Sequence, residues 1–317
     1  MYRPAITVLD CSIRDGGLMN DSRFPVDLVR ETFKAVSAAG VDYCELGYRN
    51  NPGLLGSNNF GPWRFCNEET LREAVDGVEP RCKIAIMQDA HKALSEDILP
   101  KEESVVDMIR VATYVKDMDK AIRLANSAVE KGYETTINIM AISHALDREL
   151  DEALAQVEEE TKIKACYIVD SFGALYSEDI DYYVAKYKRY LKTKEVGIHC
   201  HNNQQLAFAN TIEAIIKGAN FLDGTLYGIG RAAGNCPLEL LMGFLKNPKF
   251  NLKPLLDVVS RKYVLLQKEM RWGYYLPYMI TGILNKHPLA AMEQMKEDDA
   301  EGLVKFYDKM LGDVDPI

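Results

Sequence analysis

The sequence lacks the marks of several classes of protein. Its 38 lysines and arginines are outnumbered by 47 aspartates and glutamates, and the net charge of −9 offers no basic surface for nucleic acid. No apolar run approaches the ~18 residues that a membrane span needs. The first residues lead straight into a strand-like run, without the charged, apolar and small-residue segments of a signal peptide. We therefore expect neither a nucleic-acid partner nor a membrane partner.

A disulfide framework is also absent from the pattern. The seven cysteines are odd in number and widely scattered. Cys44, Cys82 and Cys166 lie within apolar runs, where reduced thiols of a protein core are expected. Reduced cysteines make the cytoplasm the expected compartment.

What the chain does have is a regular alternation of short apolar runs with longer amphipathic stretches. The expected strands are residues 5–10, 43–48, 82–88, 105–113, 133–142, 165–170, 195–200 and 220–227. The clearest helical stretches are residues 25–39, 118–131, 149–161, 177–192 and 204–217. This alternation predicts an α/β fold, a (β/α)8 TIM barrel, with an open doubly wound sheet as the alternative.

The chain changes character after residue 237, where no strand pattern follows. Residues 252–270 and 288–311 have helical patterns, and a tyrosine-rich turn at residues 272–278 separates them. We therefore predict a catalytic TIM-barrel domain over residues 1–245 and a helical C-terminal extension over residues 246–317.

Polar side chains gather where the first, seventh and eighth expected strands end. His199 and His201 are one residue apart on a strand, so they point to the same side. Asp15 follows the first strand, and Asn235 lies in a glycine-rich loop after the last. Those three strands are neighbours in a closed barrel, so the four groups can converge at its mouth. Such a mixed N/O site suits Mg²⁺, Mn²⁺, Zn²⁺ or Co²⁺; a structural histidine pair is the alternative.

Other charged groups are expected near the same mouth. Arg14 precedes Asp15, and its guanidinium either stabilises an enolate oxyanion or forms a buried salt bridge. Glu45 and Asp170 end expected strands, where each orients a neighbour or is simply solvated. His144 follows the fifth strand.

Three motifs together resemble the signature of a known family. Residues 10–16 have the form Asp-x-x-x-Arg-Asp-Gly, residues 199–202 the form His-x-His-Asn, and residues 228–235 form a glycine-rich loop that closes on an asparagine. By these motifs the chain resembles the pyruvate carboxyltransferase or HMG-CoA-lyase-like family (the DRE-TIM metallolyases), which contains metal-dependent aldolases, lyases and condensing enzymes. It is most similar to the 4-hydroxy-2-oxovalerate aldolases. That similarity lies in residues 40–42, 55–61, 142–144, 169–174 and 199–211.

The resemblance implies the chemistry and the roles of the residues. It implies a carbon–carbon lyase of the aldolase type that acts on a 2-oxo acid by way of a metal-bound enolate, with Mn²⁺ or Mg²⁺ as the first choice of ion. By position, the metal ligands are Asp15, His199 and His201, with Asn235 as an optional fourth, and Arg14 stabilises the enolate. The expected substrate contacts are Glu45, Asp170, Ser171 and Gly230.

One position departs from the aldolase pattern. The aldolases have a catalytic histidine three residues after the ligand aspartate, and this chain has Leu18 there. Another base must then serve, and the candidates are a water, His144, His91 or a tyrosine of the C-terminal extension such as Tyr275.

Two further functions stay open for this sequence. One is an acyl-CoA/2-oxo acid condensing enzyme similar to the isopropylmalate synthases, and the other is a non-catalytic, partner-dependent homologue. We expect a homo-oligomer, and the resemblance raises an aldehyde dehydrogenase as a candidate partner.

Overall fold

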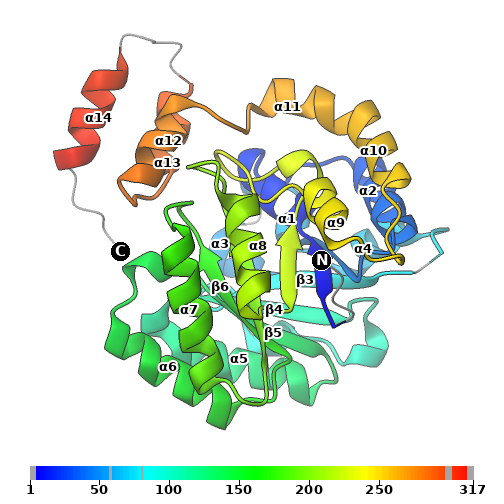
Figure 1. Cartoon of the computed structure of the whole chain (residues 1–317). Helices are drawn as coiled ribbons and strands as arrows, with labels where there is room; N and C mark the ends of the chain where they lie inside the picture. The colour runs from blue at the N-terminus through cyan, green and yellow to red at the C-terminus, as the bar shows by residue number, and fades with distance from the viewer. Residues whose placement is uncertain (1–4, 57–58, 80, 297–301, 313–317) are drawn as a thin grey trace.

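Eight parallel strands form a closed barrel, as the sequence predicts, in the order β1 to β8 (Figure 1). The structure is a computed structural model that describes residues 5–56, 59–79, 81–296 and 302–312. The strands are β1 (Thr7–Asp10), β2 (Tyr43–Tyr48), β3 (Lys83–Asp89), β4 (Met108–Thr113), β5 (Glu134–Ile139), β6 (Ala165–Asp170), β7 (Glu195–Cys200) and β8 (Phe221–Gly224). The predicted TIM barrel is therefore confirmed, and the open sheet is excluded.

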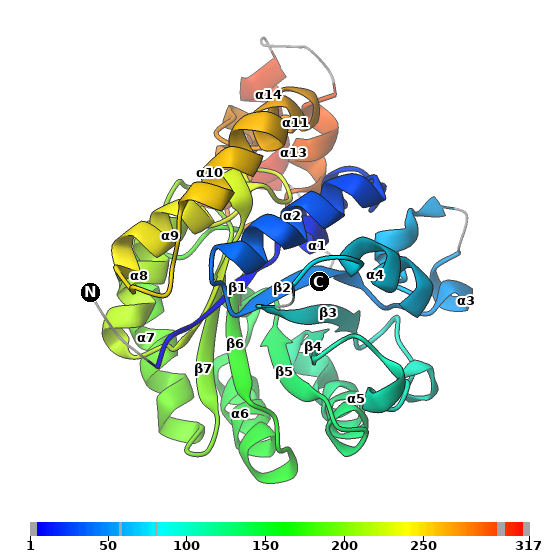
Figure 2. The same cartoon turned by 90° about the vertical axis from the view of Figure 1, so that its right-hand side faces the viewer.

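Helices lie around the outside of the barrel (Figure 2). They are α2 (Val26–Ala38), α3 (Pro52–Leu55), α4 (Glu68–Val75), α5 (Met118–Glu130), α6 (Asp147–Glu160), α7 (Ser177–Tyr190) and α8 (Ala207–Lys217), whereas the short helix α1 (Ser12–Gly16) follows β1 and is wholly buried. Helix α5 shows why they form. Its buried residues Met118, Ala121, Ile122 and Ala125 recur at spacings of three and four, so one face packs on the barrel.

The lower part of the barrel interior is packed with apolar side chains. Leu9, Tyr43, Met108 and Tyr167 belong to one buried cluster there. Gly197 makes room for the Tyr167 ring, because a Cβ at position 197 would lie 2.5 Å from ring atoms. This packing closes the barrel below and leaves its carboxyl end for polar groups.

After β8, the described part of the chain consists of helices and the loops that join them, with no further strand in the barrel. Its helices are α9 (Leu238–Leu245), α10 (Lys253–Val258), η9 (Val259–Tyr263, a π-helical turn), α11 (Val264–Met270), α12 (Leu276–Ile283), α13 (Leu289–Gln294) and α14 (Leu303–Gly312). The helix predicted for residues 252–270 thus contains a π turn. The one predicted for 288–311 is two helices, and residues 297–301 between them lie outside the described part.

Figure 1 shows α11 to α14 at the end of the barrel to which β8 points. The division into two domains at residue 245 stays a prediction. Within the described residues, no helix is both long enough and apolar enough to cross a membrane.

Candidate metal centre

The three expected metal ligands converge at the carboxyl end of the barrel. The ligand atoms of Asp15, His199 and His201 all lie within 4.8 Å of one another, and all three residues are buried. Strand β8 pairs with both β7 and β1, which brings the histidines of β7 close to the aspartate after β1. The Nε2 atoms of both histidines are buried and have no hydrogen-bond partner. Two unpartnered imidazole nitrogens beside a carboxylate fit a divalent cation.

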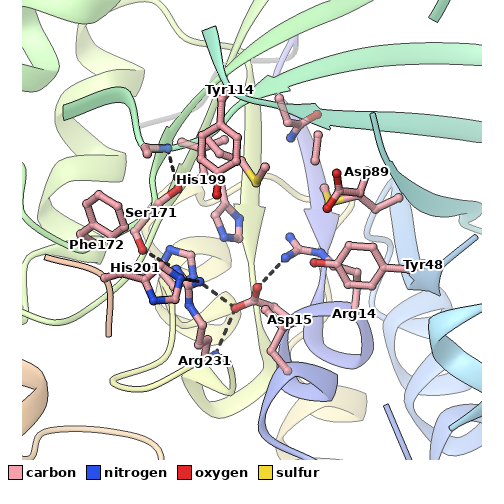
Figure 3. Close-up of a pocket in the computed structure, with 18 of the residues that line it drawn as sticks. Arg14, Asp15, Tyr48, Asp89, Tyr114, Ser171, Phe172, His199, His201 and Arg231 are labelled. Atoms are coloured by element: carbon pink, nitrogen blue, oxygen red, sulfur yellow. Dashed lines mark hydrogen bonds and ion pairs between the residues drawn. The ribbon is translucent and has the colours of Figure 1, made fainter. Parts of the chain in front are cut away.

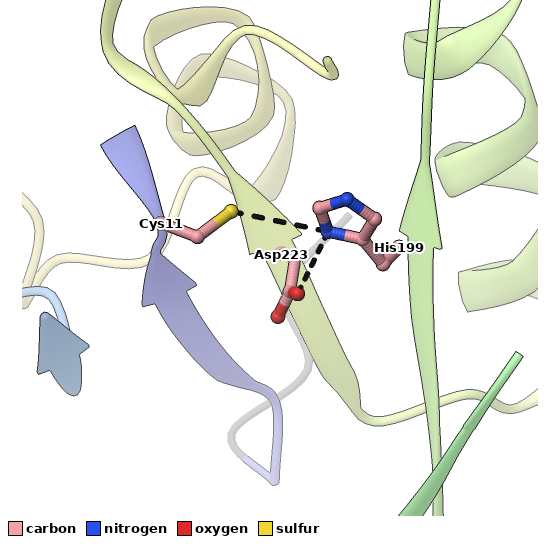
Figure 4. A group of neighbouring side chains, drawn as sticks. All are labelled: Cys11, His199 and Asp223. Carbon is pink, nitrogen blue, oxygen red and sulfur yellow. Dashed lines mark hydrogen bonds and ion pairs between the residues drawn. The ribbon is translucent and has the colours of Figure 1, made fainter. Parts of the chain in front are cut away.

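Hydrogen bonds on the far side of each ring orient the two histidines. Nδ1 of His199 lies 2.9 Å from a carboxylate oxygen of Asp223, and Cys11 Sγ lies 3.8 Å from the same nitrogen (Figure 4). Nδ1 of His201 lies 3.0 Å from the carbonyl oxygen of Asp170. Both partners accept hydrogen bonds, which assigns the proton to Nδ1 and leaves the Nε2 lone pair for a metal. Burial lowers the pKa of His201 to about 4, so its ring is neutral near pH 7.

Asp15 is held in its charged form by donors on several sides. Burial alone would raise its pKa, but the charge of Arg14 and the histidines hold the pKa well below its ordinary value. Arg14 donates to Oδ1 over 2.5 Å, and Asn235 Nδ2 donates to Oδ2 over 2.6 Å. The Asn235 Oδ1 atom is buried and has no hydrogen-bond partner, so the amide supports Asp15 and has a free acceptor.

The glycine-rich loop after β8 passes close to the ligands. A Cβ at Gly230 would lie 2.2 Å from Asn235 Nδ2 and 2.5 Å from Asp15 Oδ2. Position 230 therefore requires glycine so that the backbone can approach Asp15.

A chain of buried charges connects Arg14 with His199. Arg14 Nε donates to Glu45 over 2.8 Å, and Arg110 donates to the same Glu45 oxygen over 2.9 Å. Arg110 also donates to Asp223 over 2.7 Å, and Asp223 orients His199. This network links the guanidinium that lines the cavity to an expected metal ligand.

The site opens into a cavity of about 210 Å³. Figure 3 shows Arg14, Tyr48 and Asp89 on one side of it and His201, Ser171 and Phe172 on the other. The lining residues are Arg14, Asp15, Leu18, Tyr48, Arg64, Met87, Asp89, Lys92, Ala112, Tyr114, Asn138, Met140, Ala141, Val169, Ser171, Phe172, His199, His201, Arg231 and His287.

Of the four expected substrate contacts, only Ser171 lines this cavity. Glu45 holds Arg14 from below. The Asp170 carboxylate accepts hydrogen bonds from the backbone of Ala174 and Leu175 and so stabilises the turn after β6. Gly230 lies against Asp15. Glu45, Asp170 and Gly230 shape the site and do not line its cavity.

Neither His144 nor Tyr275, both expected as catalytic groups, lines the cavity. The turn after β5 begins with Ala141 in a left-handed conformation (φ 49°), and the His144 ring packs on Phe172 at 4.8 Å. Its Nε2 lies 2.7 Å from the carbonyl oxygen of Asn285. Tyr275 packs on the ring of Tyr278 at 5.9 Å.

His91 lies outside the cavity as well, with its Nε2 3.0 Å from a carboxylate oxygen of Asp117. These interactions hold all three candidate bases away from the metal ligands.

Sequence reasoning missed several groups that do line the cavity, and two of them, Arg231 and His287, lie close to the expected metal ligands. Arg231, in the glycine-rich loop, donates to the Ser171 carbonyl oxygen over 2.6 Å and lies 3.1 Å from His287 Nε2. His287 comes from the C-terminal helices, and burial lowers its pKa to about 4. The available signal for Arg231 was its place between two glycines of the loop motif, but nothing local pointed to His287.

Comparison with known proteins places the chain among enzymes. A family model described as HMGL-like matches residues 5–260. The chain is 33% identical over 251 residues to a 4-hydroxy-2-oxovalerate aldolase of Thermus thermophilus, covering 79% of this chain and 71% of that one. It is 31% identical over 239 residues to an oxaloacetate decarboxylase of Mycobacterium tuberculosis, covering 75% of this chain and 69% of that one.

Solved structures agree with the fold. The N-terminal domain of a candidate aldolase from Bacteroides vulgatus superposes with a TM-score of 0.82 at 28% identity, covering 95% of this chain and 99% of that one. A hydroxymethylglutaryl-CoA lyase from Pseudomonas aeruginosa superposes with a TM-score of 0.68 at 17% identity, covering 82% of this chain and 93% of that one. The second likeness supports the barrel fold alone.

Proposed function

Because this chain belongs to the HMGL-like family, we propose that it is a divalent-metal-dependent carbon–carbon lyase acting on a 2-oxo acid through its enolate. Its relatives include aldolases and lyases, and the chain is an enzyme of the lyase class. The observation that carries the proposal is the pair of buried, unpartnered Nε2 atoms of His199 and His201 beside Asp15. A divalent ion held there, which we propose to be Mn²⁺ or Mg²⁺, supplies a Lewis acid that polarises the carbonyl of a 2-oxo acid.

Arg14 is the residue we propose to stabilise the enolate oxygen. Its guanidinium lines the cavity while Glu45 and Asp15 hold its Nε and NH1 nitrogens. A planar, fixed donor aimed at developing negative charge needs little reorganisation during the reaction. The two carboxylates therefore position Arg14 before substrate arrives.

Proton transfer is where the chain differs from the aldolases it resembles. Leu18 lines the cavity and cannot move a proton, while His144 lies outside it. His287 is neutral near pH 7 and lines the cavity, but its Nε2 already faces a donor nitrogen of Arg231. We therefore expect binding and enolisation of 2-oxo acids together with poor cleavage of 4-hydroxy-2-oxovalerate.

Proton exchange at the methyl group of pyruvate tests the proposal without knowledge of the full substrate. We expect the Mn²⁺- or Mg²⁺-loaded protein to replace methyl protons with deuterium in D2O, as followed by NMR. A chelator and the His201→Ala change should each abolish the exchange. Absence both of this exchange and of pyruvate release from oxaloacetate, in a protein shown to hold its metal, would contradict the enolate chemistry.

Decarboxylation of a 2-oxo diacid is a second candidate, and Leu18 is the observation that favours it. Loss of CO2 from oxaloacetate breaks a carbon–carbon bond and leaves its electron pair in the enolate of pyruvate, which then takes a proton. This step needs no base at position 18, and one relative bears the name oxaloacetate decarboxylase. The native protein should release pyruvate from oxaloacetate faster than the His201→Ala protein does at the same metal concentration.

The homo-oligomer and the aldehyde dehydrogenase partner stay predictions.

A further inference from the structure

The cavity has more positive charge than a simple 2-oxo acid can use. The charged side chains that line it are Arg14, Asp15, Arg64, Asp89, Lys92 and Arg231. Four of these are cations and two are anions. Arg14 is paired with Asp15 at 2.5 Å. Lys92 is paired with Asp89 at 2.9 Å. In the described part of the chain, Arg64 and Arg231 form no ion pair with a carboxylate, so two guanidinium groups lack a counter-charge.

These two guanidinium groups belong to different walls of the cavity. Arg231 bonds to Ser171, and Figure 3 shows both beside His201. Arg64 ends the short turn η3 (Pro62–Arg64), and its Cζ lies 4.8 Å from the centre of the Tyr48 ring. Tyr48 lies across the cavity from Ser171 in the same view. One unpaired cation therefore stands on the wall of the metal ligand His201, and the other on the wall of Tyr48.

Arg64 is held in place but incompletely satisfied. Its guanidinium packs on the rings of Tyr48 and Phe60, at 4.8 and 4.7 Å from their centres. Stacking fixes the plane of the group and leaves its donor edges free. Its Nε is buried and has no hydrogen-bond partner. Aromatic stacking alone explains where Arg64 lies but does not satisfy that donor, whereas an anionic oxygen would.

We propose that Arg64, together with Lys92, which also lines the cavity, binds a second anionic group of the substrate. The substrate is then a 2-oxo acid whose far end bears a carboxylate or a phosphate. Its 2-oxo acid end lies at Asp15, His199 and His201, with Arg14 at the oxygen. This inference rests on the proposed function and names its substrate class. Pyruvate, with one carboxylate, leaves Arg64 without a partner.

A matched pair of ligands tests this inference. 2-Oxoglutarate and 2-oxopentanoate have the same carbon chain and differ at the far end, where one has a carboxylate and the other a methyl group. By calorimetry on the metal-loaded protein, we expect 2-oxoglutarate to bind at least about tenfold more tightly, as a charged hydrogen bond implies. 2-Oxo-4-phosphonobutanoate, in a third titration, distinguishes a phosphate-type group from a carboxylate.

Two variants assign the preference to Arg64. Arg64→Leu should bring the affinity ratio of diacid to monoacid close to one. Arg72→Leu removes a nearby arginine that pairs with Glu68 and does not line the cavity, so it should keep the native ratio. A circular dichroism melt of each variant shows that the fold is kept.

The outcomes separate this inference from the proposed function. If the protein exchanges pyruvate protons but does not prefer an acid with an anionic far end, the second subsite is overturned and the lyase function stands. The same conclusion follows if the preference survives Arg64→Leu. Binding of the diacid that depends on Arg64 supports the subsite. If the same protein neither exchanges pyruvate protons nor releases pyruvate from oxaloacetate, the enolate chemistry is removed while the subsite stands. Absence of binding by every acid in the metal-loaded protein overturns both.

Discussion

Arg14 combines burial with a place on the cavity wall. Burial disfavours its charge, but Glu45 and Asp15 more than compensate, so its pKa is raised well above the ordinary value and it stays charged. A buried arginine between two carboxylates is also a structural ion pair. The substitution to lysine separates the two functions, because an ammonium keeps the charge and loses the planar fork.

Arg14→Lys should lower turnover by about 10²-fold or more while metal content is kept. The readout is the rate of pyruvate proton exchange at saturating substrate, alongside metal analysis and a thermal melt. The exposed Arg123 of α5 provides the control, because Arg123→Lys should leave the rate unchanged. If Arg14→Lys retains its rate and only melts earlier, Arg14 is a structural residue.

Leu18 is the residue that most separates this chain from the aldolases. It packs with Tyr48, Met87, Ala112 and Met140 in a small apolar cluster that faces the cavity. This patch cannot remove a proton from a substrate hydroxyl. We therefore predict that this single position, and not the barrel around it, accounts for the missing base.

Leu18→His should increase cleavage of 4-hydroxy-2-oxovalerate, since a positioned base typically contributes about 10²–10⁴-fold. Pyruvate release, measured with Mn²⁺ present, compares the variant with the native chain. Efficient cleavage by the native chain would mean that another group, such as His287, removes the proton. Unimproved cleavage in a well-folded variant would mean that the cavity differs from an aldolase site in more than its base.

At the scale of elements, the loop after β8 contacts Asp15, one of the proposed metal ligands. Gly234 has a φ of +81°, and a Cβ there would lie 2.0 Å from the carbonyl oxygen of Gly228. Gly230 and Asn235 touch Asp15 from the same loop. The loop thus supports Asp15 through its close backbone approach.

Gly230→Ala should weaken Mn²⁺ binding by about 10–100-fold, the usual effect of disturbing groups that support a ligand. The added methyl group would collide with Asn235 Nδ2 and Asp15 Oδ2. Gly243 of α9 is the matched control, because a Cβ there meets nothing within 4 Å. Calorimetric titration with Mn²⁺ compares the two variants. Equal affinities would show that the loop can move without cost to Asp15.

Local patterns predicted the elements but not the contacts between distant ones. The alternation of apolar runs predicted all eight strands, because the periodicity of a strand is a local property of the sequence. The end of β7 predicted His199 and His201 for the same reason. His144 lies outside the cavity because its Nε2 contacts the carbonyl oxygen of Asn285, far along the chain, and no local pattern shows this contact. His287 could not be predicted, since its approach depends on how the C-terminal helices pack.

At the scale of the whole molecule, Arg110 joins opposite parts of the barrel. It is fully buried on β4 and bonds to Glu45 of β2 and Asp223 of β8, while its guanidinium lies 4.5 Å from the Tyr167 ring centre. Through these partners it connects Arg14 with His199. Two buried carboxylates share this cation.

Arg110→Met should lower the free energy of unfolding by about 3–5 kcal/mol, because it removes a buried partner and leaves Glu45 and Asp223 less compensated. Urea denaturation measures this change. Arg123→Met, on the exposed face of α5, should change stability by less than about 0.5 kcal/mol. Similar stability in the two variants would show that the carboxylates do not need Arg110.

The central claim is that Asp15, His199 and His201 bind one divalent ion at the mouth of the barrel. Metal content per chain, measured after dialysis against Mn²⁺, tests it most directly in the native protein, His199→Ala, His201→Ala and the control His144→Ala. We predict one ion per chain in the native protein and the control, and little in the two ligand variants, with all four folded by circular dichroism. Unchanged metal content in both His199→Ala and His201→Ala would contradict the claim.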